Sequence, residues 1–125
     1  MKKIALVILI GAIILSVSNV FSWWWMTLLC GFLIGFLRYS TAMIFCISTL
    51  TASFGWGIPF LYQILTSPII KLAGAISSIL GFGFLGEPLI IAAVILFGIL
   101  LSFSGSWFAI ALRPFMPTKI LLIKF

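Results

Sequence analysis

A single arginine interrupts an apolar stretch that runs from Ile4 to Ile70, and this pattern constrains the fold of the chain most strongly. Arg38 is the only charged residue in that stretch. A helix needs about 20 mostly apolar residues to cross the hydrocarbon core of a bilayer, and such segments lie on both sides of Arg38. We therefore interpret residues 37–41 as a tight turn at a membrane surface that joins two antiparallel transmembrane helices.

The composition excludes an ordinary water-soluble domain. Of the 125 residues, 65% are hydrophobic and 6% are charged, whereas soluble domains carry roughly 25% charged residues. A chain of this length has room for about four crossings and for no separate soluble domain. We expect an all-α integral membrane protein of the cell membrane, in which residues 1–125 form a single transmembrane helical domain.

The apolar runs and the residues between them predict where the helices lie. Four transmembrane helices are expected over about residues 3–20, 24–37, 41–64 and 88–112. The second is short for a full crossing, and Arg38 compensates by extending its side chain to the headgroups. A further short helix, over about residues 68–80, has an apolar side and a side with Lys71, glycine and serine. This pattern predicts an amphipathic helix lying on the outer membrane surface.

The N-terminal segment has two interpretations. Lys2 and Lys3 precede an apolar run that ends at Ser16, Val17 and Ser18, and a secretory signal peptide has the same pattern. We expect a retained first helix with its N-terminus in the cytoplasm, and a cleaved leader is the alternative.

The positive charges predict the orientation in the membrane. The chain has seven lysine and arginine residues and one acidic residue. A clustered basic surface would indicate nucleic acid, but these cations are isolated between apolar runs, as the positive-inside rule describes. The orientation that leaves only Lys71 outside makes both termini cytoplasmic, with lipid headgroups as contacts of the charged side chains. The inside cations are then Lys2, Lys3, Arg38, Arg113, Lys119 and Lys124.

Three consecutive tryptophans, Trp23, Trp24 and Trp25, follow the first helix. Indole rings concentrate at the headgroup level of membranes, so we expect these residues to anchor the chain at the outer surface. A platform on which a ligand stacks is the alternative.

Small residues predict close helix packing. Gly31 and Gly35 form a GxxxG pattern, which lets another helix backbone approach closely. The last helix carries a stripe of small residues with the same property: Gly98, Ser102, Gly105, Ser106 and Ala109.

Two glycines and a proline lie close together in the third predicted helix, at Gly55, Gly57 and Pro59. Proline removes a backbone donor and clashes with the preceding turn, so we expect the helix to kink or open here. We favour a structural kink over a binding site near Tyr62 and Gln63, because the break lies in the outer half of the helix.

The inventory of reactive side chains is small. With no histidine, no aspartate, one glutamate and two cysteines, the chain cannot by itself supply the usual three or four metal ligands or a Ser-His-Asp triad. Glu87 is expected to lie at a helix start, near the positive end of the dipole or beside Lys71. A contact of Glu87 with a cation or a basic partner is the alternative. We expect no enzymatic activity, no cofactor and no resident metal.

Cys30 and Cys46 lie eight residues before and after Arg38. An antiparallel pair that turns at Arg38 puts them at the same depth, so they form a candidate thiol pair. A disulfide or half of a metal site shared with another subunit is one interpretation. The simpler interpretation is that both are small buried hydrophobic residues.

Three classes of function fit these features. The favoured prediction is a non-catalytic accessory or scaffold subunit of a larger membrane protein complex, since small-residue faces, short loops and little chemistry suit a packing role. The alternative is a small homo-oligomeric permease, channel or lipid-handling protein. A membrane enzyme that uses Glu87 is the weakest, because the chain has no second acid. No small-molecule substrate is indicated.

Overall fold

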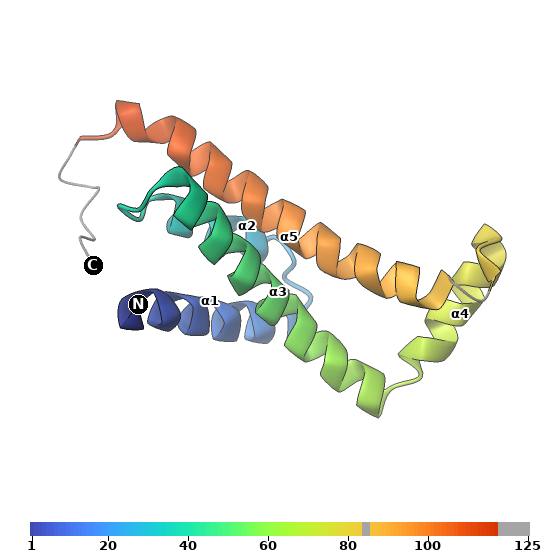
Figure 1. The fold of residues 1–125 in the computed structure, drawn as a ribbon. Coiled ribbons are helices and arrows are strands. Elements are labelled where there is room, and N and C mark those ends of the chain that lie inside the picture. Colours follow the sequence, from blue (N-terminus) through green and yellow to red (C-terminus); the bar gives the residue numbers. More distant parts are fainter. Residues whose placement is uncertain (84–85, 118–125) are drawn as a thin grey trace.

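The computed structural model describes residues 1–83 and 86–117, and within these residues the only regular structure is helical (Figure 1). Lys119 and Lys124, which the sequence assigns to the cytoplasmic side, lie outside the described residues. The elements are α1 (Lys2–Val20), α2 (Met26–Gly35), α3 (Thr41–Thr66), α4 (Ile69–Leu80), α5 (Gly86–Leu112) and the short 3₁₀ helix η2 (Arg113–Phe115).

Three of these helices, α1, α3 and α5, are long and apolar enough to cross a membrane. The prediction of four spans is not confirmed by length, because α2 has 10 residues and extends only about 15 Å. The expected helix over residues 24–37 is shortened at both ends. Residues 21–25 form turns before it, and after Gly35 the backbone continues in turn-like hydrogen bonds, such as Leu37 N–H to the Ile34 carbonyl.

The helices run back and forth along one axis of the molecule (Figure 1). α1 packs along α3, α2 packs along α5, and α3 also packs against α5. The N-terminus, the turn between α2 and α3, and the end of α5 therefore gather at one end of the molecule. At the other end, α4 lies between the last turns of α3 and the first turns of α5 (Figure 1).

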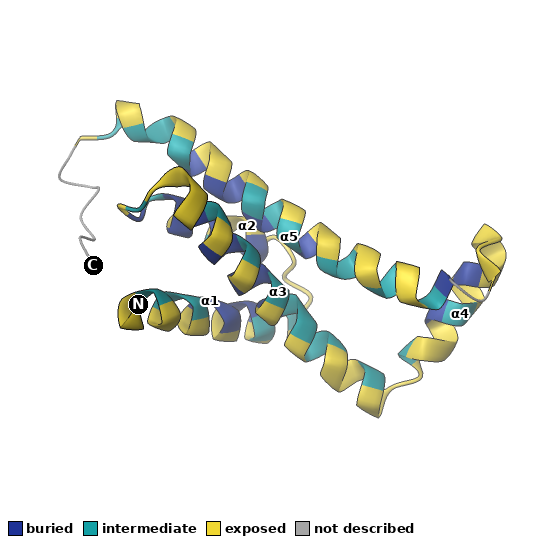
Figure 2. Ribbon diagram, in the orientation of Figure 1, coloured by how far each residue is buried: buried dark blue, intermediate teal, exposed yellow. Residues whose placement is uncertain are grey.

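Burial divides the molecule into two parts (Figure 2). We call α1, α2, residues 41–56 of α3 and residues 98–112 of α5 the packed half, and it contains an apolar cluster formed by Ile34, Leu37, Ile44 and Ile47. We call residues 57–66 of α3, α4 and residues 86–97 of α5 the open half. Here α3 and α5 diverge, and most of their side chains are exposed.

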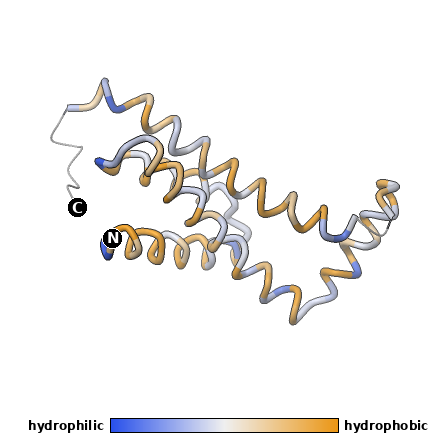
Figure 3. Tube along the Cα trace, in the orientation of Figure 1, coloured by the Kyte–Doolittle hydropathy of each residue, from blue (hydrophilic) through white to orange (hydrophobic). Residues whose placement is uncertain are grey.

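Hydropathy also varies along the length of the molecule (Figure 3). Apolar residues fill the lengths of α1, α3 and α5, whereas hydrophilic positions lie mainly at helix ends, in the loop after α1 and around α4. Among the described residues, the cations of α1, the α2–α3 turn and η2 are at the end that holds the N-terminus and the end of α5. Lys71 and Glu87 belong to the opposite end, in α4 and the first turn of α5.

The amphipathic helix α4 packs on α5 through its small residues. Ala73 and Ser77 are buried, and the Ser77 hydroxyl donates a 2.8 Å hydrogen bond to the carbonyl of Gly83. The large apolar side chains of α4 point away from the rest of the chain, and Ile79 is 84% exposed. Within the described residues, the chain therefore leaves the apolar face of α4 largely uncovered.

Candidate functional site

Backbone contact at glycines holds α2 against α5 in the packed half. A methyl group added at Gly31 would overlap the carbonyl oxygen of Ser102, and one added at Gly35 would lie 2.7 Å from the carbonyl oxygen of Ser106. Gly105 of α5 is equally close to the Leu28 carbonyl. The helices therefore touch along a strip that only residues without a side chain permit.

Arg113 fixes the end of α2. Its Nε and one terminal nitrogen donate hydrogen bonds of 2.9 and 2.6 Å to the carbonyl of Gly35, and the same terminal nitrogen also donates to the carbonyl of Leu37. The last carbonyls of a helix have no partner within the helix and form the negative end of its dipole. Arg113 thus supplies both the donors and the charge that the short helix α2 needs.

A cluster of serines joins α3 to α5. The Ser48 hydroxyl oxygen lies 2.9 Å from that of Ser102 and 3.4 Å from that of Ser106, and all three residues are fully buried. Because these hydroxyls bond to one another and to helix carbonyls, the cluster crosslinks the two helices without leaving a polar group for a solute.

Asn19 compensates for the proline in α3. Pro59 has no backbone N–H, so the carbonyl of Gly55, four residues earlier, loses its normal helical partner. The side-chain amide of Asn19 in α1 donates a 3.1 Å hydrogen bond to this carbonyl. The expected opening of the helix is wrong: α3 continues without interruption through Pro59 to Thr66, because a neighbouring helix replaces the missing donor.

Trp56 closes the packed half where α3 and α5 begin to diverge. Its indole N–H donates a 2.9 Å hydrogen bond to the hydroxyl of Thr27 in α2. Its ring covers Gly98 of α5, where an added methyl group would lie 2.6 Å from the indole. Trp56 therefore connects three helices at one level, and α3 makes no comparable contact beyond it within the described residues.

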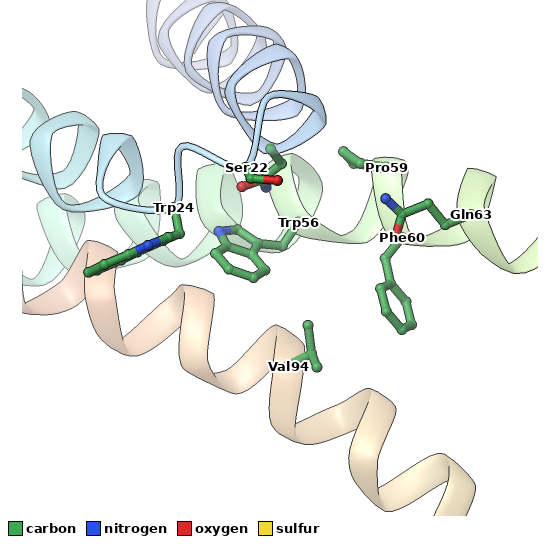
Figure 4. Close-up of a pocket in the computed structure, with 8 residues that line it drawn as sticks. Ser22, Trp24, Trp56, Pro59, Phe60, Gln63 and Val94 are labelled. Carbon is green, nitrogen blue, oxygen red and sulfur yellow. The ribbon is translucent and has the colours of Figure 1, made fainter. Parts of the chain in front are cut away.

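A cavity of about 290 Å³ lies directly beyond Trp56, between α3, α5 and the loop after α1 (Figure 4). Its polar wall consists of Asn19, Ser22 and Gln63, and its aromatic wall consists of Trp24, Trp56 and Phe60. α5 contributes Val94. None of these side chains is charged.

A second hollow, of about 410 Å³, lies on the α1 side of α3 and shares Pro59 and Gln63 with the first. The segment that the sequence suggested as a kink therefore borders both hollows of the open half.

The other residues predicted from the sequence lie apart from this cavity. Trp23 and Trp25 are about half exposed in the loop after α1, and Arg38 and Lys71 are exposed in the α2–α3 turn and in α4. Glu87 packs against Gly74 of α4, where an added methyl group would lie 2.6 Å from its carboxylate oxygen.

The two thiols are not joined. Cys30 and Cys46 are free, with Cys30 half-buried and Cys46 exposed. The Cys30 sulfur lies near Gly11 of α1, at 3.5 Å from the position of an added methyl group. Among the described residues no group of three or more histidine, cysteine, aspartate or glutamate side chains could hold a metal ion.

Three contacts were not foreseen from the sequence: Asn19 on Gly55, Trp56 on Thr27, and Arg113 on the end of α2. Pro59 did indicate that a backbone hydrogen bond of this helix is missing. The sequence contains no signal for the side chain that would provide it, because the pairing depends on how α1 and α3 pack.

Comparison with known proteins identifies no relative of the chain. No family model, curated protein or solved structure matches the chain.

Proposed function

We propose that this chain is a non-catalytic accessory or scaffold subunit of a larger membrane protein complex. The observation that carries the proposal is the contrast between the halves. In the packed half, glycines, serines and Arg113 make contacts between the chain's own helices. In the open half, α4 packs on the start of α5, but much of the apolar surface of α3 and α5 stays uncovered, and large side chains such as Leu61 and Leu65 are 60% and 79% exposed.

We propose further that the chain crosses the membrane four times with both termini in the cytoplasm. α2 is the short crossing, extended by the turns on either side of it and adapted to the bilayer by local thinning. The positive-inside rule supports this orientation, because Lys2, Lys3, Arg38 and Arg113 lie at one end of the molecule, the end that holds the N-terminus and the end of α5.

A permease or channel formed by one copy is less well supported. A solute path needs a series of unsatisfied polar groups or water along the bundle. At the centre of the packed half, Ser48, Ser102 and Ser106 are bonded to one another, and among the described residues Thr51 alone has a buried hydroxyl without a partner. Trp56 covers the entrance to this region from the cavity side. Catalysis has equally little support, since the carboxylate of Glu87 contacts Gly74 and does not line the cavity.

Purification in a mild detergent followed by native mass spectrometry tests the proposal. We expect the tagged chain to carry a second membrane protein at fixed stoichiometry. Leu61→Asn, in the open half, should reduce recovery of that protein at least about tenfold, the equivalent of roughly 1.4 kcal/mol. Leu33→Asn is the matched control, because Leu33 is similarly exposed, at 67%, but lies on α2 in the packed half.

A pure homo-oligomer that conducts a solute in liposomes would contradict the subunit proposal and support the permease alternative. Equal loss of the second protein with both variants would show that the open half is not the docking surface.

A further inference from the structure

We propose that the cavity between α3 and α5 contains water continuous with the aqueous phase on the α4 side, and that it binds uncharged hydrogen-bonding groups such as hydroxyls and esters. This site is independent of the partner proposed above, since it lies inside the chain, between its own helices and the loop after α1.

The loop that forms the floor of the cavity has backbone groups that need hydrogen-bond partners. Within the described residues, the carbonyls of Val20, Phe21 and Ser22 accept no hydrogen bond, and the N–H groups of Trp24 and Trp25 donate none. Ser22 adopts a left-handed conformation with φ of 60°, which is uncommon for a residue other than glycine. Its hydroxyl also lines the cavity without a partner among the described residues.

Helix lengths place this loop below the far ends of α3 and α5. Asn19 is bonded to Gly55, which lies 14 residues after Thr41, or about 21 Å along the helix. α3 then continues for 11 residues to Thr66, or about 16 Å. α1 itself has 19 residues, or about 28 Å, so the loop after it lies just inside the outer edge of a hydrocarbon core of about 30 Å, with the last turns of α3 beyond it.

Non-helical backbone at membrane depth occurs only where protein buries it or where it lines a water-filled cavity. The loop after α1 is exposed, with Phe21 and the three tryptophans at about half or more of their full accessibility. The remaining solution is water, and the open space between α3 and α5 gives it a route from the α4 end. Each backbone group left without a partner would otherwise destabilise the fold.

The chemistry of the walls defines the class of ligand. The side-chain carbonyl of Asn19 remains free to accept, because only its nitrogen is bonded to Gly55. Gln63 offers both a donor and an acceptor, and the indole N–H of Trp24 offers a donor. No charged residue lines the cavity. Neutral groups that both donate and accept hydrogen bonds therefore match these walls, whereas an ion finds no opposite charge to hold it there.

Cysteine accessibility in liposomes tests the presence of water. In a Cys30→Ala, Cys46→Ala background, Ser22→Cys and Gln63→Cys each place one thiol in the cavity. Leu100→Cys is the control, because Leu100 is 55% exposed on the middle of α5, away from the cavity. A permanently cationic methanethiosulfonate reagent should modify both cavity thiols at least tenfold faster than the Leu100→Cys thiol.

Modification of all thiols after denaturation in detergent verifies that each is reactive. Cavity thiols that react as slowly as the Leu100→Cys thiol before denaturation would overturn the proposal, because lipid chains would then fill the space.

Protection of Gln63→Cys from the reagent tests the ligand class. Slower labelling with added glycerol indicates a free polyol, whereas slower labelling with diolein in the vesicles indicates the hydroxyl and ester groups of a lipid. A Ser67→Cys thiol in the exposed link before α4 should be unaffected in both cases. Labelling of Gln63→Cys that neither additive slows would refute binding of uncharged groups.

Discussion

Parts of α3 and α5 belong to both the packed and the open half, but the contacts between these two helices differ from one half to the other. In the packed half, the serines of the two helices bond to each other, and the rings of Phe45 and Phe103 stack with centroids 4.1 Å apart. Beyond Trp56, no residue pair of this kind joins the two helices within the described residues. The difference shows that apolar character alone does not pack membrane helices.

Small residues and bonded polar groups decide where the helices touch. Lipid is as apolar as a leucine side chain, so burial of apolar surface gives membrane helices little reason to associate. The buried residues of α5 from Gly98 onward are all glycine, serine or alanine. The residues of α5 before Gly98 are mostly large, and α5 there has no helix beside it except α4.

The largest expected effect is the difference in stability between two glycine-to-alanine substitutions, one in each half. Gly31→Ala places a methyl group on the Ser102 carbonyl oxygen and should separate α2 from α5, at a cost of about 3 kcal/mol or more. Gly57→Ala, in the open half, meets nothing within 4 Å and should stabilise α3 by up to about 1 kcal/mol. Thermal unfolding in detergent measures both, and a loss of stability in Gly57→Ala as large as in Gly31→Ala would remove the distinction between the halves.

The next effect concerns the two arginines of the packed end. Arg113→Met leaves the carbonyl of Gly35 without a donor and removes one of the two donors to the carbonyl of Leu37, which keeps the N–H of Tyr39. The change should cost about 1.5–3 kcal/mol, the range for hydrogen bonds to charged groups. Arg38→Met removes an exposed charge and should change stability by less than about 0.5 kcal/mol. Equal destabilisation by the two changes, measured in the same detergent, would show that Arg113 does not cap α2.

A smaller effect tests whether Asn19 replaces the donor that Pro59 lacks. Asn19→Leu should destabilise the protein by about 1–2 kcal/mol, because the Gly55 carbonyl is left unpaired. In a Pro59→Ala background the residue at 59 can donate to Gly55 itself, so the same change should cost at least about 1 kcal/mol less. A double-mutant cycle of thermal stability measures this coupling, and additive effects would contradict the compensation.

The sequence predicted much of the fold because membrane crossing leaves few choices of backbone structure. Long apolar runs required helices, and the three long helices were confirmed, with α3 ending two residues later and α5 beginning two residues earlier than expected. The predicted α2 was too long, because hydropathy does not show where a turn ends a helix within an apolar run. Residues 21–25 and 36–40 form turns, although both segments contain large apolar side chains such as Phe21, Trp24 and Leu37.

The candidate site was harder to predict because it depends on an absence of packing. Gln63 and Pro59 were singled out from the sequence, but the helix does not open at Pro59, because α3 is continuous there. The cavity exists because α1 and α2 are shorter than α3 and α5, so the loop after α1 lies part of the way along them. The difference in helix length depends on where each helix ends, and helix ends are difficult to locate in an apolar sequence.

Disulfide crosslinking of engineered cysteine pairs tests the division into two halves most directly. In the Cys30→Ala, Cys46→Ala background, Ser48→Cys with Ser102→Cys joins positions whose hydroxyl oxygens are 2.9 Å apart. Gln63→Cys with Ile90→Cys joins positions on opposite sides of the cavity, since Ile90 lies one helical turn from Val94. We predict rapid oxidation of the first pair and no crosslink in the second, and rapid crosslinking of the second pair would contradict the open arrangement of α3 and α5.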